Sequence, residues 1–311
     1  MLNNTNEKMP HRRARDIAAD QPDTANDGGL SESDMKKIAA YINENVGIQL
    51  PESKRTLVEG RLRRRMRKLG FSSFRTYIDY VFDTRDGADE GLHLIDALTT
   101  NKTDFFREPE HFDYLTSIAL MNVEKKRMAD GRDNLKIWSA GCSSGEEPYT
   151  LSIVLSEVAA KMKGIRFEIL ATDISQTCLQ KAHRGIYTEQ QIEPISLELR
   201  KKYLLRSRRK DDELVQMGPE LRSLVKFQSL NLMSDNFNLP HKMDVIFCRN
   251  VMIYFNNEIR EKLVAKFERQ LHDGGYLFVG HSESLNGIET RLQQVAPMVY
   301  RKFDSPEGGV R

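Results

Sequence analysis

Cysteine, long apolar runs and a strong excess of charge are rare or absent in this sequence. It has three cysteines, Cys142, Cys178 and Cys248, and none belongs to a Cys-x-x-Cys pair. So few thiols exclude a disulfide framework and favour a reducing compartment. No run approaches the roughly 18 apolar residues that cross a bilayer, and the N-terminus lacks an apolar signal core. We therefore expect a cytoplasmic protein with no membrane insertion, whose cysteines are packing residues and not nucleophiles or metal ligands.

The net charge of +2 is too small for a general polyanion binder, so we expect no nucleic-acid partner. Charged residues make up 30% and hydrophobic residues 39% of the 311 positions, an ordinary balance for a globular protein. A chain of this length can form one large domain or two modest domains with buried cores.

Changes in composition divide the chain into a leader, a helical domain, a linker, an α/β domain and a tail. Residues 1–30 are polar, lack hydrophobic periodicity and end with a glycine pair and a leucine, which predicts a disordered leader. Residues 31–100 have apolar side chains at helical spacing and predict a helical bundle. We expect residues 101–134 to form a linker and residues 304–311 to form a frayed tail.

From residue 135 to residue 303, segments of strand character alternate with helical segments. Buried strands are predicted at 135–141, 166–173, 225–232, 243–250, 274–280 and 296–303. Such alternation predicts a mostly parallel sheet with helices on both faces, whose ligands bind beyond the carboxyl ends of the strands. The alternation is interrupted at about 185–224, where short apolar pieces and turn signals predict a small inserted antiparallel β-subdomain.

The first predicted strand runs into the small-residue loop SAGCSSGEEP, residues 139–148. Glu146 and Glu147 open the helix that follows this loop. Carboxylates at this point would repel the pyrophosphate of a dinucleotide, whereas they suit a ligand that carries an ammonium or sulfonium group. The loop therefore favours S-adenosylmethionine over NAD. The alternative is that the two glutamates only stabilise the helix dipole.

Polar residues also end three further predicted strands. Asp173 ends the second strand, where an acidic residue commonly binds both ribose hydroxyls of a nucleoside. Asn231 and Leu232 end the third strand and are placed to contact the edge and the face of an adenine ring. Asn250 ends the fourth strand, where its amide can reach the amino-acid part of a cofactor. Each residue taken singly has an ordinary alternative as a turn or helix-capping residue.

The segment TTNKTDFFREP, residues 99–109, places Arg107 and small polar residues beside Phe105 and Phe106. Such a segment can fold over a bound cofactor while the two phenylalanines anchor it. The alternative is an ordinary helix N-terminus with an exposed arginine.

Five segments together closely resemble motifs of the CheR family of chemotaxis receptor methyltransferases. They are TNKTDFFREPEHF, IWSAGCSSGEEPYTL, ATDIS, FCRNVMIYF and LFVGHSESL, and the resemblance extends from about residue 30 to residue 303. It implies an all-α N-terminal domain followed by a Rossmann-like class I methyltransferase sheet with an inserted β-subdomain. By matching position, it implies cofactor contacts at Asn101, Thr103, Arg107, Glu146 or Glu147, Asp173, Asn231, Leu232, Arg249 and Asn250.

The resemblance implies methyl transfer from S-adenosylmethionine to glutamate side chains of methyl-accepting chemotaxis receptors, with S-adenosylhomocysteine as the product. A carboxylate is already ionised near pH 7, because its reference pKa is about 4.3, so no general base is needed. We therefore expect Arg107 to orient the substrate carboxylate and Tyr254 to hydrogen-bond near the transferring methyl group. The alternative is a non-catalytic regulator that binds S-adenosylmethionine, and the presence of Arg107, Asn250 and Tyr254 together argues against it.

The segment from Lys54 to Lys68 is strongly basic. On a helix, Arg61, Arg64, Arg65 and Lys68 would fall on one face. The resemblance favours docking of this face on the acidic methylation region of the receptor's cytoplasmic helices, and the alternative is a solvated basic face. We expect the protein to act as a monomer.

Overall fold

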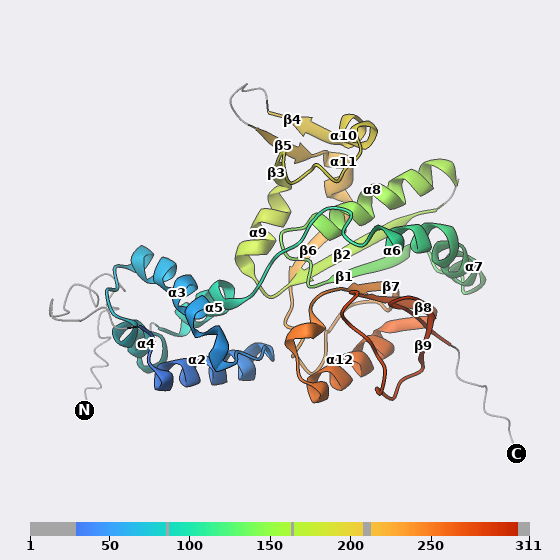
Figure 1. The fold of residues 1–311 in the computed structure, drawn as a ribbon. Coiled ribbons are helices and arrows are strands. Elements are labelled where there is room, and N and C mark those ends of the chain that lie inside the picture. The colour runs from blue at the N-terminus through green and yellow to red at the C-terminus, as the bar shows by residue number, and fades with distance from the viewer. Residues whose placement is uncertain (1–28, 85–86, 163–164, 208–212, 304–311) are drawn as a thin grey trace, which may run out of the picture. The chain divides into compact units, whose positions relative to one another are not determined.

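The computed structural model describes residues 29–84, 87–162, 165–207 and 213–303 (Figure 1). Nearly all of the predicted leader and the whole predicted tail, residues 304–311, lie outside the described residues. The chain divides into two compact units, residues 1–100 and residues 101–311. Within the described residues, no helix is long and apolar enough to span a membrane.

The first unit is all-α, as predicted. Its elements are α2 (Glu32–Val46), the 3-10 helix η1 (Glu52–Lys54), α3 (Arg55–Leu69), α4 (Phe74–Asp83) and α5 (Gly87–Leu98). Helix α2 begins at Ser31, whose side chain accepts the Asp34 N–H, and α3 ends at Gly70 in the left-handed conformation. On α3 the buried residues are Val58, Leu62 and Met66, so the apolar face follows the helical spacing of the sequence.

The second unit begins with helices where we expected a linker. Helix α6 (Pro109–Tyr114), a π-helical turn (Leu115–Ala119) and α7 (Leu120–Ala129) fill most of residues 101–134. Phe112, Leu115, Leu120 and Val123 are buried in the core that covers the sheet. The segment is therefore part of the second unit, because it buries an apolar helical face that a linker would expose.

A seven-stranded sheet forms the centre of the second unit, in the order β6-β2-β1-β7-β8-β10-β9. The strands are β1 (Leu135–Ala140), β2 (Phe167–Asp173), β6 (Val225–Ser229), β7 (Met243–Cys248), β8 (Leu271–Val279), β9 (Leu292–Ala296) and β10 (Val299–Lys302). Strands β6, β2, β1, β7 and β8 are parallel to one another, and β10 is antiparallel to both β8 and β9. This order and the flanking helices confirm the predicted Rossmann-like α/β class.

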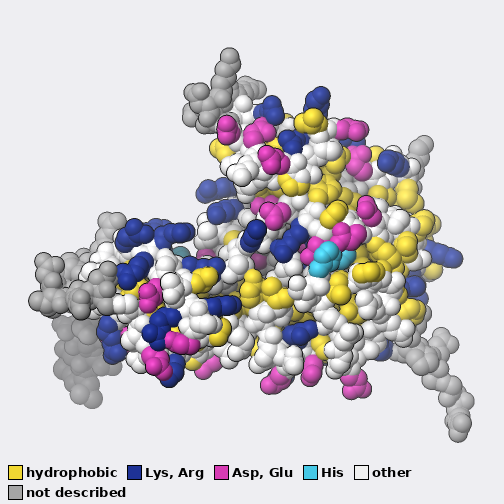
Figure 2. All heavy atoms as spheres, in the orientation of Figure 1, with side chains coloured by type: hydrophobic (Ala, Val, Ile, Leu, Met, Phe, Trp, Pro, Cys, Tyr) yellow, Lys and Arg dark blue, Asp and Glu magenta, His cyan; other side chains and the backbone are white. Residues whose placement is uncertain are grey.

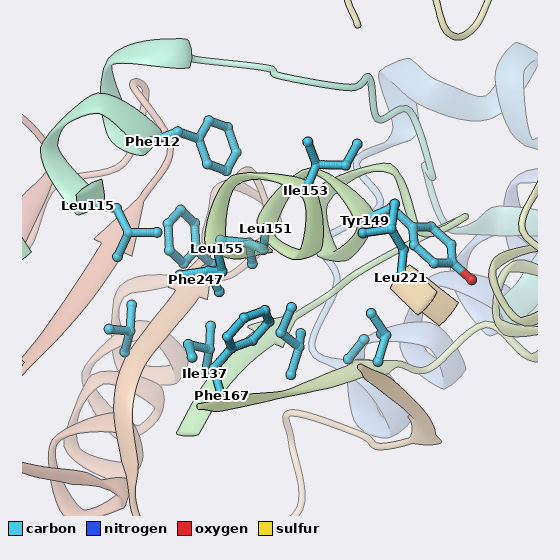
Figure 3. Packing of buried hydrophobic residues seen from close by; sticks show 14 of the residues in the cluster. Phe112, Leu115, Ile137, Tyr149, Leu151, Ile153, Leu155, Phe167, Leu221 and Phe247 are labelled. Carbon is cyan, nitrogen blue, oxygen red and sulfur yellow. The ribbon is translucent and has the colours of Figure 1, made fainter. Parts of the chain in front are cut away.

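Apolar side chains alternate between the two faces of the sheet. From β1, Leu135 and Ile137 join the core beneath α8 (Glu146–Lys161), α6 and α7 (Figure 3). Trp138 and Ala140 join a second core on the opposite face, with Leu263, Val264 and Phe267 of α12 (Asn257–Gln270). Both faces are therefore buried, which explains why the central strands read as nearly continuous apolar runs.

A second, three-stranded antiparallel sheet confirms the predicted β-subdomain. Its order is β3 (Ile186–Thr188), β5 (Leu214–Met217) and β4 (Leu204–Arg206). The short helices α10 (Leu197–Tyr203) and α11 (Pro219–Ser223) accompany these strands. Helix α9 (Gln176–Arg184) leads into the subdomain from the main sheet (Figure 1).

All three cysteines are unpaired and buried, as packing residues should be. Cys142 lies in the loop after β1, Cys178 lies on α9 and Cys248 ends β7. Burial raises the pKa of each thiol.

Candidate active site

Most of the predicted site residues of the second unit lie at or just beyond the carboxyl ends of four neighbouring strands, and the others lie in residues 101–107. Strand β1 has β2 on one side and β7 on the other, so the chain order reverses at β1. Parallel sheets bind their ligands at such a reversal, outside the carboxyl ends of the strands. The structure therefore brings the loop after β1, Asp173, Asn231 and Arg249–Asn250 to one edge of the sheet.

The loop after β1 is held in a tight turn that needs glycine. Gly141 has φ of 83°, and a methyl group added there would lie 2.5 Å from Cγ2 of Val251. The N–H groups of Gly141 and Cys142 both donate to the Thr172 carbonyl of β2, at 2.8 and 2.9 Å. The loop therefore packs directly against the end of β2 and against the segment that follows β7.

Glu146 and Glu147 have different surroundings, although both are buried. Glu147 accepts hydrogen bonds from Ser139 Oγ and from Arg249 Nε, each at 2.7 Å, so its charge is paired inside the protein. Glu146 accepts from Ser144 Oγ at 2.8 Å and from Gln191 Nε2 at 3.4 Å. Among the described residues, no Lys, Arg or His lies within ion-pair distance of Glu146.

Burial raises the pKa of Glu146, and its hydrogen bond from Ser144 partly offsets this effect. A carboxylate that is 2% exposed and has no ion-pair partner among the described side chains fits a ligand with a positive charge. This property of Glu146 matches the sulfonium and ammonium groups of S-adenosylmethionine, and Glu147 does not share it.

Asp173 fixes the loop after β1 as well as the end of β2. Its two carboxylate oxygens accept the N–H groups of Ser143 and Ser175, both at 2.8 Å. The N-cap of α9 is Ser175, whose side chain accepts the Cys178 N–H. Asp173 is therefore not the N-cap of α9, although its bond to the Ser175 N–H is that of a turn residue.

Residues 101–108 form a strap that crosses the loop after β1 and the first turn of α8. The Asn101 carbonyl accepts Ser143 Oγ at 2.8 Å, and the Phe106 N–H donates to Thr150 Oγ1 at 3.1 Å. Phe105 is 1% exposed, and its ring centroid lies 4.9 Å from that of Tyr187. The phenylalanine thus anchors the strap, and it leaves Thr103 half-buried between two attachment points.

Arg107 lies between two residues with unusual backbone angles. Phe106 has φ of 52° and Glu108 has φ of 55°, values that residues other than glycine rarely adopt. The half-buried Arg107 side chain donates to the Lys102 carbonyl at 3.3 Å. Strained backbone of this kind persists where the surroundings impose it, and it is common at functional sites.

Arg249 imposes part of this geometry. Its side chain is 3% exposed, and its Nη1 donates to the Arg107 carbonyl at 2.6 Å while Nε binds Glu147. Nη1 also lies 3.4 Å from His111 Nδ1 and 3.5 Å from a Glu108 carboxylate oxygen. The described contacts of the guanidinium are therefore internal, and they link the strap to α8 and β7.

The residues after β6 form a turn. The Asn231 side-chain oxygen accepts the Met233 N–H at 2.9 Å, and the Asn231 carbonyl accepts the Ser234 N–H at 3.0 Å. Leu232 is half-buried and packs against the core beneath α12. This turn matches the ordinary alternative for Asn231, and adenine contacts by Asn231 and Leu232 stay a prediction.

Asn250 begins the segment that carries Tyr254, and it has φ of 60°. Tyr254 ends the 3-10 helix η3 (Met252–Tyr254) and is half-buried. The Asn250 N–H donates to Glu283 Oε2 at 2.8 Å. We did not single out Glu283 from the sequence, although it lies in the segment LFVGHSESL, just beyond a predicted strand.

His111 is a second residue that the sequence did not mark. It is 1% exposed, and burial and the neighbouring Arg249 lower its pKa to about 4. Glu108, His111 and His281 offer possible ligand atoms that lie within 4.8 Å of one another. The Arg249 guanidinium touches two of these three residues, and its positive charge opposes a metal ion at this position.

The four basic residues predicted to dock a substrate differ in their surroundings within the first unit. Arg61 donates to the Leu98 and Thr99 carbonyls at the end of α5, at 2.6 and 3.0 Å. Arg65 forms a bidentate pair with the buried Glu90, at 2.8 and 2.6 Å. Arg64 and Lys68 are exposed, in a part of α3 where Lys and Arg side chains gather (Figure 2). The prediction of one free basic face is therefore wrong for Arg61 and Arg65, which bind α5.

Two family models and several relatives match most of this chain. Residues 33–99 match the model of the CheR methyltransferase all-alpha domain, and residues 101–300 match that of the CheR methyltransferase SAM binding domain. The chemotaxis protein methyltransferase of Borreliella burgdorferi is 38% identical over 88% of this chain and 95% of its own length. That of Escherichia coli is 34% identical over 87% of this chain and 91% of its own length.

Among solved structures, a TehB-like SAM-dependent methyltransferase from Corynebacterium glutamicum is 15% identical, with a TM-score of 0.32 over 62% of this chain and 99% of that one. Similarity at this level adds nothing to the assignment, which depends on the two family matches. Because these matches together cover most of the sequence, the chain belongs to the CheR family of S-adenosylmethionine-dependent methyltransferases.

Proposed function

We propose that this methyltransferase esterifies glutamate side chains in the helical methylation region of chemotaxis receptors. The proposal extends to this chain what the names of its relatives state, action in chemotaxis. The observation that supports it most directly is the buried carboxylate of Glu146, which has no ion-pair partner among the described residues and lies beside the strand ends where we expect the methyl donor to bind. The enzyme would act as a monomer in the cytoplasm, where such a receptor region is accessible.

We assign two different roles to the residues around the strand ends. Glu146 faces the positive charge of the cofactor, and Asp173, Asn101, Thr103 and Asn250 complete its surroundings. Glu147 and Arg249 bind each other, so we assign them to holding the site together. When bound, S-adenosylmethionine supplies a methyl group on a sulfonium, which a carboxylate oxygen can attack.

Alignment is the main task of the protein in this reaction, since an ionised glutamate is already the nucleophile. Arg107 can hold one carboxylate oxygen by a charge-assisted hydrogen bond and leave the other oxygen to react. The Tyr254 hydroxyl forms a hydrogen bond near the transferring methyl group. No side chain has to accept a proton, so turnover should not depend on a basic group near neutral pH.

Arg107→Ala tests the role of Arg107. We expect the variant to fold normally and its turnover to fall about 10²- to 10³-fold, the effect of removing one aligned charged donor. The assay measures labelled methyl groups transferred to a receptor fragment and released as methanol by base. Arg107→Lys should recover part of the activity, because it keeps the charge and loses the planar fork.

Lys102→Ala is the matched control for this test. Lys102 is a neighbouring exposed cation on the same strap, and its backbone carbonyl, which the substitution keeps, accepts the hydrogen bond from Arg107. We expect wild-type turnover from this control. Wild-type turnover from a folded Arg107→Ala variant would contradict the proposed role of Arg107, and no base-labile methyl product from the wild-type enzyme would contradict the function itself.

Receptor docking by α3 is proposed for Arg64 and Lys68, the exposed members of the predicted face. The double variant Arg64→Glu/Lys68→Glu should raise the apparent KM for the receptor fragment and reduce its dependence on salt. The matched control, Lys125→Glu/Lys242→Glu, makes the same charge change at exposed positions of the second unit. Equal KM values for the two double variants would exclude α3 from docking.

A further inference from the structure

Glu283 is a buried carboxylate just beyond the end of β8. It is 1% exposed and gathers backbone N–H groups from two segments. Its Oε2 accepts Gly280 N–H at 2.6 Å and Asn250 N–H at 2.8 Å, and its Oε1 accepts Ile253 N–H at 3.3 Å. The carboxylate thus joins the end of β8 to the segment that follows β7.

The segment that Glu283 binds is the one that carries Asn250 and Tyr254. Asn250 has φ of 60°, and an acceptor for its N–H stabilises that conformation. Ile253 belongs to η3, so the carboxylate also binds the N-terminal end of the helical turn that ends at Tyr254. Gly280 completes the arrangement, because a methyl group there would lie 2.5 Å from the Asn250 side-chain nitrogen.

The charge of Glu283 is balanced by backbone dipoles. Among the described residues, no Lys, Arg or His forms an ion pair with it. Burial raises its pKa, whereas hydrogen bonds from the backbone of Gly280, Asn250, Met252 and Ile253 act in the opposite direction. A neutral side chain of the same shape could not accept all of these donors, since an amide has one acceptor oxygen and two donor hydrogens.

We propose that Glu283 is a positioning residue for methyl transfer, which acts by fixing Asn250 and Tyr254 at the strand ends. The inference rests on the proposed function, in which these two residues contact cofactor and reacting atoms. Glu283 itself contacts backbone N–H groups and not the substrate.

Glu283→Gln is the direct test, and Glu283→Asp keeps the carboxylate on a side chain that is one methylene shorter. Asp244→Asn is a control for the loss of a buried carboxylate, because Asp244 is also 1% exposed and accepts a backbone N–H, from Lys136 at 2.8 Å, in addition to its ion pair with Arg132. Asp244 lies near the opposite end of β7. All variants are compared by melting temperature, by kcat and KM for methyl transfer, and by hydrogen exchange of residues 249–256.

We expect Glu283→Gln to lower kcat at least about tenfold while KM for the receptor fragment stays within about twofold, because Arg107 and α3 are unchanged. Exchange of residues 249–256 should accelerate, and Glu283→Asp should lie between Glu283→Gln and the wild type. Asp244→Asn should lower the melting temperature without changing kcat or that exchange.

Unchanged kcat and exchange in a folded Glu283→Gln variant would overturn the proposal. So would an equal loss of kcat in Asp244→Asn, because the effect would then follow stability alone. If Glu283→Gln does not fold, wild-type kcat and exchange in Glu283→Asp would overturn it instead. The exchange measurement needs no substrate, so it tests Glu283 even if the proposed methyl acceptor proves wrong.

Discussion

Replacement of Arg249 by methionine should destabilise the second unit, because it leaves a buried carboxylate without its cation. Glu147 is 8% exposed and would keep Ser139 as its remaining described partner. The variant also removes the donor for the Arg107 carbonyl, which Arg249 binds at 2.6 Å. The substitution therefore affects both α8 and the strap.

The size of this effect is set chiefly by the lost ion pair with Glu147, to which the lost contacts with the Arg107 carbonyl and Glu108 add. Removing one member of a buried ion pair costs about 3–5 kcal/mol, chiefly because the other charge stays buried. We expect a loss of about 4 kcal/mol for Arg249→Met, with a smaller loss of about 2–3 kcal/mol for Glu147→Gln, because Arg249 keeps its contacts with Arg107 and Glu108. Domains are commonly stable by 5–15 kcal/mol, roughly, so both variants should fold.

Urea unfolding of a double-mutant cycle measures the coupling between the two residues. The double variant leaves neither charge unpaired, so its loss of free energy should be smaller than the sum of the single losses by about 2 kcal/mol. Lys262→Met serves as the control, because Lys262 pairs with Glu258 on the exposed face of α12 and should have no measurable effect.

Additive losses, within about 0.5 kcal/mol, would refute the reasoning, because Arg249 and Glu147 would then act independently. A loss for Arg249→Met as small as that of Lys262→Met would refute it as well. It would mean that the buried guanidinium contributes no more than a surface cation.

Three further outcomes follow from the described contacts. Glu146→Gln should weaken binding of S-adenosylmethionine about 10- to 100-fold in calorimetric titration. The stability of the protein without ligand should change little. Unchanged affinity would contradict the assignment of Glu146. Arg65→Met should destabilise the first unit, because Glu90 would keep only Tyr77 among its described partners; a melting curve checks this, and Arg67→Met is the exposed control. The folded His111 binds protons less readily than its ordinary pKa of 6.5 predicts, since burial and Arg249 lower that pKa to about 4. The unfolded chain then binds more protons, so stability should fall as the pH drops from about 6.5 to about 4, by up to about 3 kcal/mol, and His111→Gln should flatten this part of the curve.

The central strands could be predicted because burial on both faces leaves a local signal. All six residues of β7 are buried, and its sequence is apolar apart from Asp244. Strand β9 was missed because only its first residue, Leu292, is fully buried. It forms by pairing with β10, a contact that no local pattern specifies. The start of β8 was also missed, since the Asp273–Gly275 segment resembles a turn although it continues a strand from Leu271.

The candidate site residues could be found in the sequence where they lie at the ends of predicted strands. The sequence could not separate Glu146 from Glu147, because Arg249, the partner of Glu147, lies 102 positions away, directly after β7. The same limit applies to Arg61 and Arg65, whose partners on α5 are 25 to 38 positions away. Residue type and helical spacing predicted a basic face, and only the fold shows which of its members are already bound.

The reactivity of the three buried cysteines would report local opening of this enzyme. Thiolates carry out alkylation, and burial with a raised pKa keeps each thiol protonated and out of reach of a reagent in the closed protein. The rates of labelling at Cys142, Cys178 and Cys248 would therefore measure local opening at the loop after β1, at α9 and at the end of β7. Mass spectrometry could measure these three labelling rates without any added cysteine, in the presence and in the absence of cofactor.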